Sequence, residues 1–251
     1  MTVLVAAGWE PSGRMGLLAD LESCRLAGVS AVGICTAVTA QGEGGFARTR
    51  VPPDVVRAQV TGVLTTDVRA VKFGMVPTRA VLDALMDSLA GFSGWRVVDP
   101  VVRSSSGARL SSLRPADFQS LAHEKSVLTP NALEAAWLLG HRGNLQSAED
   151  LVDAAKKLFG QGWGGVLVKG GHLPGDRLVD VLVTRDGIER LTHRKLPRTA
   201  LHRGTGCRHA STLTATLALG GSLSQAARAA RRRIQRYLGT GPARARGLSA
   251  R

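Results

Sequence analysis

Aromatic residues, cysteines and long apolar runs are scarce in this sequence, and each absence excludes a class of protein. Aromatic residues make up 4% of the 251 residues, so the core must consist mainly of leucine, valine and alanine, which suits a parallel sheet covered by helices. No apolar run reaches the ~18 residues of a membrane span, and no signal peptide is expected. The three cysteines match neither a disulfide framework nor a zinc motif. We therefore expect a cytoplasmic protein, with no membrane partner.

Acidic residues are absent from the last quarter of the chain. Residues 191–251 hold 13 Lys and Arg and no Asp or Glu, although the whole chain has a net charge of +14. This excess either attracts a polyanion, such as a nucleoside triphosphate or nucleic acid, or forms a solvated arginine-rich face. Tyr237 is the only aromatic residue there that could stack on a base, so nucleic acid is not the expected partner.

Apolar segments alternate with helical patterns along the chain, which predicts an α/β fold. Segments 3–7 and 31–35 flank a predicted helix over 15–26, and this βαβ unit implies a parallel sheet. Further strands are expected at 70–74, 95–100, 126–128 and 165–169, with a hairpin at 179–184 and 189–193. Further helices are expected at 54–65, 78–89, 115–122, 132–139, 148–159, 207–219 and 222–238.

Two segments depart from this alternation. Residues 39–50 are rich in glycine and polar residues and are interpreted as a flap over a site, and Asp54 is expected to cap the next helix. With no linker or internal repeat, residues 1–238 are predicted to form a single doubly wound domain, followed by a basic C-terminal tail over 239–251.

The segment Gly204-Thr205-Gly206-Cys207 lies where a helix of small residues is expected to begin. Glycines allow the backbone to approach a ligand closely, and the free N–H groups of a helix N-terminus attract anions. The helix dipole would also shift Cys207 toward the thiolate. The segment is therefore either a phosphate-transfer site or a glycine-rich turn before a buried helix.

Several motifs at the expected strand ends follow one another in a characteristic order. They are Ala7-Gly8-x-x-Pro11-Ser12-Gly13, Ala19-Asp20-Leu21, 36–41, Lys72-Phe73-Gly74-Met75, Val98-Asp99-Pro100-Val101, Ser106-Gly107, Leu128-Thr129-Pro130-Asn131, Lys169-Gly170-Gly171-His172 and Gly204 to Cys207. In these motifs, over nearly its full length, the chain resembles the hydroxymethylpyrimidine/phosphomethylpyrimidine kinases of thiamine biosynthesis. The resemblance implies a ribokinase-like three-layer α/β/α sandwich with a mainly parallel central sheet, ATP and Mg²⁺ as cofactors, and a homodimer.

The resemblance also implies which residues hold the pyrimidine substrate. Gly8, Asp20 and Gln41 match the positions that bind the aminopyrimidine ring in the family. A ring with an exocyclic amine and ring nitrogens needs both donors and acceptors, which these residues supply. Without the resemblance, Asp20 would be interpreted as a solvated residue of the first helix.

The phosphate and metal residues follow from the same resemblance. Asn131 and Glu134 match positions near magnesium and phosphate. Asp99 is expected either to act in the same region, toward magnesium and ATP, or to hold a loop, and Thr205 is expected to contact the nucleotide. Asn131 and Glu134 share one helix face, since they are three residues apart, although they could equally form a helix cap.

Lys169, Gly204, Gly206 and Cys207 are the expected catalytic residues. Lys169 would neutralise charge on the transferred phosphoryl group, and Cys207 would polarise the substrate hydroxyl or act as its base.

The chain departs from the family pattern in two places. Trp9-Glu10 and Arg14 alter the first loop, Leu201-His202-Arg203 replace the residues before Gly204, and Arg208-His209 follow Cys207. Arg203 and Arg208 are expected to add charge beside the phosphate site. A phosphorylated or bulkier acceptor, a pyridoxal or pyridoxine kinase, and an inactive homologue with a nucleic-acid-binding C-terminal region remain alternatives to the pyrimidine kinase.

Overall fold

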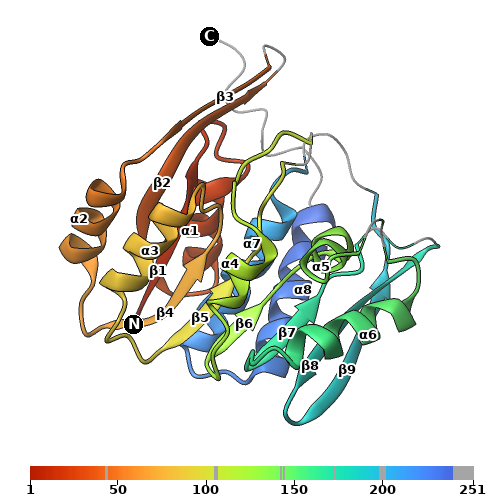
Figure 1. The fold of residues 1–251 in the computed structure, drawn as a ribbon. Helices are drawn as coiled ribbons and strands as arrows, with labels where there is room; N and C mark the ends of the chain where they lie inside the picture. The colour runs from red at the N-terminus through yellow and green to blue at the C-terminus, as the bar shows by residue number, and fades with distance from the viewer. Residues whose placement is uncertain are drawn as a thin grey trace.

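The computed structural model contains one nine-stranded sheet in the order β3-β2-β1-β4-β5-β6-β7-β8-β9 (Figure 1). The structure describes residues 1–42, 45–104, 107–141, 143, 145–171, 173, 175–197 and 202–239. Ser106, His172, Leu201 and residues 240–251 of the predicted tail lie outside the described residues.

Six strands of the sheet run in parallel, as the predicted βαβ pattern requires. At one edge β3 runs antiparallel to β2, and at the other β8 and β9 form an antiparallel hairpin next to β7. The strands are β1 Thr2–Trp9, β2 Ser30–Gly42, β3 Gly45–Arg50, β4 Val68–Phe73, β5 Trp95–Val98, β6 Ser126–Leu128, β7 Gly165–Val168, β8 Arg177–Thr184 and β9 Gly187–Arg194.

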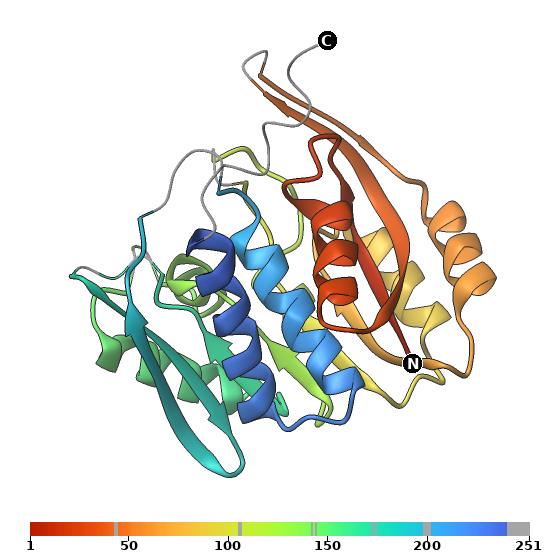
Figure 2. The same cartoon turned by 180° about the vertical axis from the view of Figure 1, so that it is seen from behind.

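Helices cover both faces of the sheet, so the predicted three-layer α/β/α sandwich is confirmed. The face seen in front in Figure 2 carries α1, α7 and α8, and the opposite face carries the other five described helices. The helices are α1 Gly16–Leu26, α2 Pro53–Val63, α3 Arg79–Ser88, α4 Pro115–Gln119, α5 Ala132–Leu138, α6 Ala148–Phe159, α7 Thr205–Ala218 and α8 Leu223–Gly239.

The core consists of the aliphatic residues that the composition favours. Val5, Val71 and Leu167 on central strands are fully buried between the helical layers. Continuous apolar strands of this kind form because both faces of the sheet are covered. None of the described helices is both long and apolar enough to cross a membrane.

The structure refines one local prediction and contradicts another. The segment 39–50, interpreted from the sequence as a flap, is largely a β-hairpin, in which β2 continues to Gly42 and β3 pairs with it from Gly45. Its outer strand is mostly exposed, so it lacks the apolar alternation by which strands are recognised. The N-cap of α2 is Pro52 rather than Asp54, which lies in the first turn instead.

Candidate active site

Side chains from three neighbouring strand ends meet at the carboxyl edge of the parallel sheet. Asp99 follows β5, Asn131 follows β6 and Lys169 follows β7. Lys169 Nζ donates to Asp99 Oδ1 at 2.9 Å, and the backbones of Asn131 and Lys169 form a parallel bridge. Ligands bind at this edge in open α/β sheets, so three predicted site residues share one location.

Three charged groups interact closely at this edge. Burial opposes the charge of Lys169, but Asp99 and Glu134 outweigh it and raise the pKa of the lysine. Burial alone would raise the pKa of Asp99, but Lys169 and Lys72 outweigh it and lower that pKa. Burial, helped by Asp99, raises the pKa of Glu134 from its ordinary 4.5 to about 7. The cluster therefore holds one stable ion pair and one carboxyl that titrates near neutrality.

Asn131 and Glu134 form the helix cap that the sequence left open as an alternative. Asn131 is the N-cap of α5, where its Oδ1 accepts from the Glu134 N–H at 2.9 Å. Glu134 Oε2 accepts from the Asn131 N–H at 2.7 Å, which completes a capping box. Capping does not exclude a second role, because each carboxylate or amide oxygen can accept more than one bond.

The donor set at this edge fits a magnesium ion. Asp99, Glu134 and Asn131 offer only oxygen ligands, which Mg²⁺ prefers, and it commonly takes one or two carboxylates together with substrate phosphates. The raised pKa of Glu134 reflects a buried carboxyl beside a second one, which a divalent cation would relieve. Among the described residues no three His, Cys, Asp or Glu side chains are arranged to hold a metal, so the protein alone offers an incomplete shell.

The N-terminus of α7 lies over the Asp99–Lys169 pair. Gly204 is its N-cap, Thr205 its first residue, and a Cβ on Gly206 would lie 3.7 Å from Lys169 Nζ and 3.9 Å from Asp99 Oδ2. The free N–H groups at the start of a helix bind anions. The predicted motif therefore opens a helix directly above a buried lysine.

Gly204 has a structural requirement as well. Its φ is +69°, and an added Cβ would lie 2.2 Å from the carbonyl oxygen of Arg14 in the first loop. Gly16, with a φ of +64°, approaches the carbonyl oxygen of Gly8 just as closely. The first loop thus packs against the start of α7, which only glycines at these positions permit.

The expectation that Cys207 is shifted toward the thiolate is wrong. Burial raises the pKa of the Cys207 thiol to about 11, helped by the Asp20 and Asp99 carboxylates. Lys72 and a hydrogen bond with the Gly16 backbone act in the opposite direction without reversing the shift. Desolvation is the largest cause of the shift, so Cys207 is a neutral thiol at neutral pH.

Gly8 and Gln41, two of the three residues predicted to bind the substrate, lie on neighbouring strands. Gly8 lies next to the last residue of β1, where a Cβ would come within 2.7 Å of Met75 Sδ. Gln41 lies near the end of β2, and its Oε1 accepts from Arg203 NH2 at 3.2 Å. Arg203 therefore connects the loop before α7 with a predicted substrate residue.

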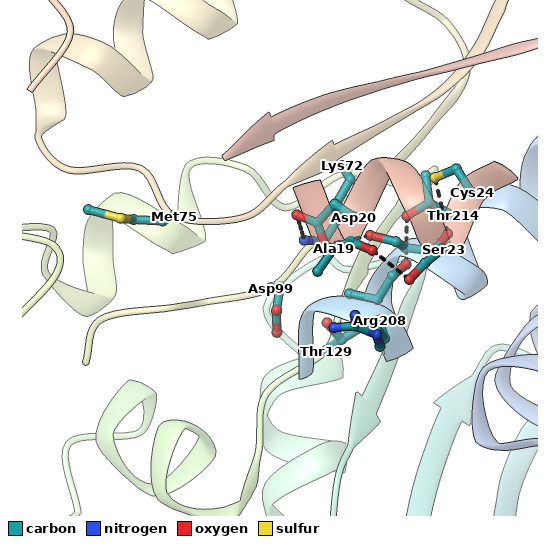
Figure 3. Close-up of polar contacts among 12 residues, drawn as sticks. Ala19, Asp20, Ser23, Cys24, Lys72, Met75, Asp99, Thr129, Arg208 and Thr214 are labelled. Atoms are coloured by element: carbon teal, nitrogen blue, oxygen red, sulfur yellow. Dashed lines mark hydrogen bonds and ion pairs between the residues drawn. The ribbon is translucent and has the colours of Figure 1, made fainter. Parts of the chain in front are cut away.

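Asp20 is fully buried rather than solvated on the first helix. Its Oδ2 lies 2.7 Å from Lys72 Nζ, and its Oδ1 accepts from Ser211 Oγ at 2.7 Å. Both carboxylate oxygens therefore have partners inside the protein. Figure 3 shows the Lys72–Asp20 contact, with Asp99 nearby.

Lys72 is the site residue that the sequence analysis did not single out. It lies in β4 with none of its side chain exposed, and its charge acts on both Cys207 and Asp99. The signal was present, because a lysine within the apolar run Ala70-Val71-Lys72-Phe73 must be buried with a partner once that run is a central strand.

The arginine after Cys207 does not project toward phosphate, contrary to expectation. Arg208 is 5% exposed, donates to the Arg14 carbonyl oxygen at 2.7 Å, pairs with Glu22 at 2.9 Å, and stacks on the Tyr237 ring. It therefore ties the first loop, α1 and α8 to α7. His209 is buried, and burial lowers its pKa to about 3, so it is neutral.

Part of the basic excess in the last quarter is balanced by acids elsewhere. Arg231 pairs with the buried Asp180 of β8, and Arg228 pairs with Glu189 at 2.6 Å. Both arginines line an open cavity of about 490 Å³ between β9 and α8. These ion pairs favour a role for the two arginines within the fold over attraction of a polyanion.

Comparison with known proteins identifies close relatives. A family model described as phosphomethylpyrimidine kinase matches residues 10–248. The hydroxymethylpyrimidine/phosphomethylpyrimidine kinase of Rhizobium meliloti is 36% identical over 91% of this chain and 86% of its own length.

Solved structures agree with this relationship. The pyridoxal kinase of Staphylococcus aureus in complex with AMP-PCP and pyridoxal has a TM-score of 0.83 at 28% identity, covering 93% of this chain and 86% of its own. The phosphomethylpyrimidine kinase of Clostridium difficile 630 has a TM-score of 0.77 at 28% identity, covering 94% and 98%. Both a pyrimidine kinase and a vitamin B6 kinase thus share the fold.

Proposed function

The chain belongs to the phosphomethylpyrimidine kinase family of phosphotransferases, and we propose that it phosphorylates the hydroxymethyl group of 4-amino-5-hydroxymethyl-2-methylpyrimidine with ATP, for thiamine biosynthesis. The observation that carries this proposal is the position of the α7 N-terminus directly above the Lys169–Asp99 pair. Phosphoryl transfer needs positioning and charge stabilisation more than covalent chemistry, and this arrangement offers both.

Lys169 and the start of α7 are assigned to the transferred phosphoryl group. The lysine is held in its charged form by Asp99 and Glu134, so it presents a fixed positive charge. Gly204 and Gly206 keep side-chain bulk away from the first N–H groups of α7, and Thr205 lies between them. Together they would stabilise the negative charge that develops on the phosphoryl oxygens.

Glu134, Asn131 and Asp99 are assigned to Mg²⁺, which would supply neutralising charge for the ATP phosphates. Asp99 is already ionised, because Lys169 and Lys72 lower its pKa. Glu134 has a pKa of about 7 and would release its proton when a cation binds. The relatives' complexes with AMP-PCP support ATP as the phosphate donor.

Cys207 is assigned to the substrate hydroxyl as a polarising thiol. Because burial keeps it protonated, it can hydrogen-bond to the hydroxyl oxygen or align it, but it is a poor nucleophile. No covalent enzyme intermediate is therefore part of the proposal. The thiol occupies the first turn of α7, two residues after Thr205 and next to the phosphate-binding N–H groups.

Gly8 and Gln41 are assigned to direct contact with the pyrimidine ring. Asp20 has both oxygens engaged by Lys72 and Ser211, so its contribution to substrate binding is through these partners. The Arg203 guanidinium beside Gln41 provides a positive charge at this end of the site. That charge supports a second reaction, in which the monophosphate product binds as an anion and is converted to the pyrophosphate.

Product identification by ³¹P NMR tests this proposal. The purified chain, incubated with Mg²⁺, ATP and the hydroxymethylpyrimidine, is expected to form a phosphate monoester first and a pyrophosphate later. Lys169→Met should reduce both reactions by about 10²-fold or more, because one charge that acts on the transition state is lost. Hydrolysis of ATP without either ester, or no turnover at all, would contradict the proposal.

Pyridoxal kinase is the second candidate function. It is favoured by the TM-score of 0.83 to the S. aureus enzyme, whose complex contains pyridoxal. Both substrates carry a hydroxymethyl group on an aromatic nitrogen heterocycle, so the same residues at the transfer site would serve either. The difference must come from the first loop and Gln41, which face the ring.

We also propose the organisation in which this reaction takes place. Residues 1–238 would act as a single kinase domain, with 239–251 as a basic tail. The cysteines are free thiols, which supports a reducing cytoplasm. A homodimer, common in the family, would show in light scattering as twice the mass of the 26.4 kDa chain.

A further inference from the structure

Lys72 carries a buried charge that the proposed reaction has not yet used. Its Nζ lies 2.7 Å from Asp20 Oδ2, and neither side chain is exposed to solvent (Figure 3). Burial opposes the charge, but Asp20, Cys207 and Asp99 outweigh it and raise the pKa of Lys72, so the ammonium form persists. Burial raises the pKa of the Asp20 carboxyl, against the lowering effect of Lys72 and Ser211, so the pair lies wholly inside the protein at a cost in desolvation.

This ion pair is linked to the helix that carries Cys207. Asp20 Oδ1 accepts from Ser211 Oγ at 2.7 Å, and Ser211 lies four residues after Cys207 on α7. Residues at this spacing share one helix face, so the face with Cys207 rests on Asp20 and Lys72. A Cβ on Gly74, which follows β4, would lie 3.1 Å from Lys72 Nζ, so little space remains for Nζ to move.

A contribution to the stability of the fold is a weak explanation for the burial of two opposite charges. Two charges lose much of their hydration free energy on burial, and well-packed apolar residues of similar volume are often as stable or more so. The location at the transfer site offers a different reason. Lys72 stands on β4, next to β5 and Asp99, and its charge also acts on the thiol of Cys207.

We propose that Lys72 is a positioning residue of the phosphoryl-transfer site: its ammonium group, fixed by Asp20, holds the Cys207 face of α7 in its reactive arrangement. Lys72 needs no contact with substrate for this role. It acts on α7 through Asp20 and Ser211. The expected loss of kcat rests on the proposed kinase reaction, whereas the expected shift in the pKa of Cys207 does not.

The kinetic test uses the double variant Lys72→Met/Asp20→Asn, which replaces the ion pair by neutral side chains of similar size. Because no unpaired charge is left behind, the double variant is expected to melt close to the wild type, whereas each single variant should melt lower. The kcat of the double variant should nevertheless fall at least about tenfold, with KM for ATP unchanged. Wild-type kcat in a folded double variant would overturn the proposal and leave the pair a purely structural role.

Separate measurement of kcat and of KM for the pyrimidine distinguishes a positioning role of the Lys72–Asp20 pair from direct binding of the substrate by Asp20. If Asp20 contacts the pyrimidine, the double variant and Asp20→Asn should mainly raise KM for the pyrimidine. If the pair positions α7, kcat should fall instead, and Ser211→Ala should reduce kcat in the same direction, since it removes the link from α7 to Asp20. An effect of these variants on the pyrimidine KM alone would contradict the positioning role.

A measurement on the thiol needs no substrate and remains decisive if a variant is inactive. Lys72 lowers the pKa of Cys207 and Asp20 raises it. Iodoacetamide alkylation of the Cys207 peptide, followed by mass spectrometry against pH, should therefore shift to higher pH in Lys72→Met and to lower pH in Asp20→Asn. Identical profiles in all variants would overturn the proposal, whereas shifted profiles without pyrimidine kinase activity would count against the proposed function alone.

The pair Arg57–Asp87 provides the matched control. It joins α2 and α3 at 3.1 Å, and both side chains are largely exposed. Exposed ion pairs contribute little to stability, so Arg57→Met/Asp87→Asn should leave kcat, melting and the alkylation profile of Cys207 as in the wild type. A similar loss of kcat in this control would show that the effect of the buried pair is not specific.

Discussion

Cys207 and Glu134 are two candidate site residues whose pKa values are raised. Both lie near the Asp99–Lys169 pair, and in both burial is the main cause of the raised pKa. The consequences differ, however. The thiol is neutral throughout the physiological range, whereas the carboxyl changes its charge near neutrality. The first property argues against a thiolate nucleophile, and the second connects activity and metal binding with pH.

Replacement of Cys207 tests its assignment to the substrate hydroxyl. Cys207→Ala is expected to lower kcat by about 10²-fold at saturating substrates, because the group that orients the hydroxyl is lost. Cys35→Ala, in β2, is the control and should leave kcat unchanged. A Cys207→Ala variant with the kcat of the wild type would show that the thiol has no part in the reaction.

The carboxyl of Glu134 makes the stability of the ligand-free protein depend on pH. Its pKa is raised to about 7, so the folded state holds this proton more tightly than the unfolded chain, and the associated stability is lost as pH rises from about 4.5 to 7. Glu134→Gln should remove this loss. Its melting temperature should exceed that of the wild type at pH 8 and match it at pH 4.5.

The same variant tests the metal assignment. Mg²⁺ with AMP-PCP should raise the melting temperature of the wild type more at pH 8 than at pH 6, since the cation needs the ionised carboxylate. Glu134→Gln should lose this difference, while Glu149→Gln, an exposed acid on α6, should retain it. Equal stabilisation of wild type and Glu134→Gln at both pH values would contradict the metal role.

At the scale of elements, α7 organises the site. It begins over Asp99 and Lys169 and packs against α1 and α8, and Arg208 in its first half ties it to the first loop. Its two glycines differ in what they permit. Gly204 allows the left-handed turn that starts the helix, whereas Gly206 places no side chain above the lysine, where we propose that a phosphate group binds.

Alanine substitutions distinguish these two glycines. Gly204→Ala forces a φ of +69° on a residue with a Cβ and brings it against the Arg14 carbonyl, so it should lower the free energy of unfolding by ~1–3 kcal/mol. Gly206→Ala meets only ordinary contacts and should keep the stability of the wild type. Its kcat should nevertheless fall about tenfold or more, because the added methyl group occupies the phosphate space. Chemical denaturation and steady-state kinetics on both variants measure the contrast, and equal stability losses would refute it.

For the whole molecule, the sequence predicts the arrangement of strand ends well, because parallel strands bring their carboxyl ends to one edge. Asp99, Asn131 and Lys169 belong to motifs expected at strand ends, and they meet at this edge. The pairing of Lys72 with Asp20 could not be predicted in the same way, since the two residues are far apart in the chain and meet only when α1 packs on the sheet. The pKa of Cys207 likewise depends on desolvation by the folded core.

The β2–β3 hairpin at the edge of the sheet was also difficult to predict from the sequence. Its outer strand is mostly exposed and has no apolar face to bury, so its pairing follows from backbone hydrogen bonds that residue types do not reveal. Gln41 lies on this hairpin, next to Arg203 from the other end of the chain. The part of the site that we assign to the ring was therefore less predictable than the part that we assign to phosphate.

The ratio of kcat/KM for the hydroxymethylpyrimidine to that for pyridoxal, measured on one preparation with Mg²⁺ and ATP, tests the central claim most directly. Both candidate substrates use the same transfer chemistry, so the ratio reports the contacts with the ring alone. We predict a ratio of at least about 10²-fold in favour of the pyrimidine. A ratio in favour of pyridoxal, or activity with neither substrate, would contradict the assignment of this chain as a pyrimidine kinase.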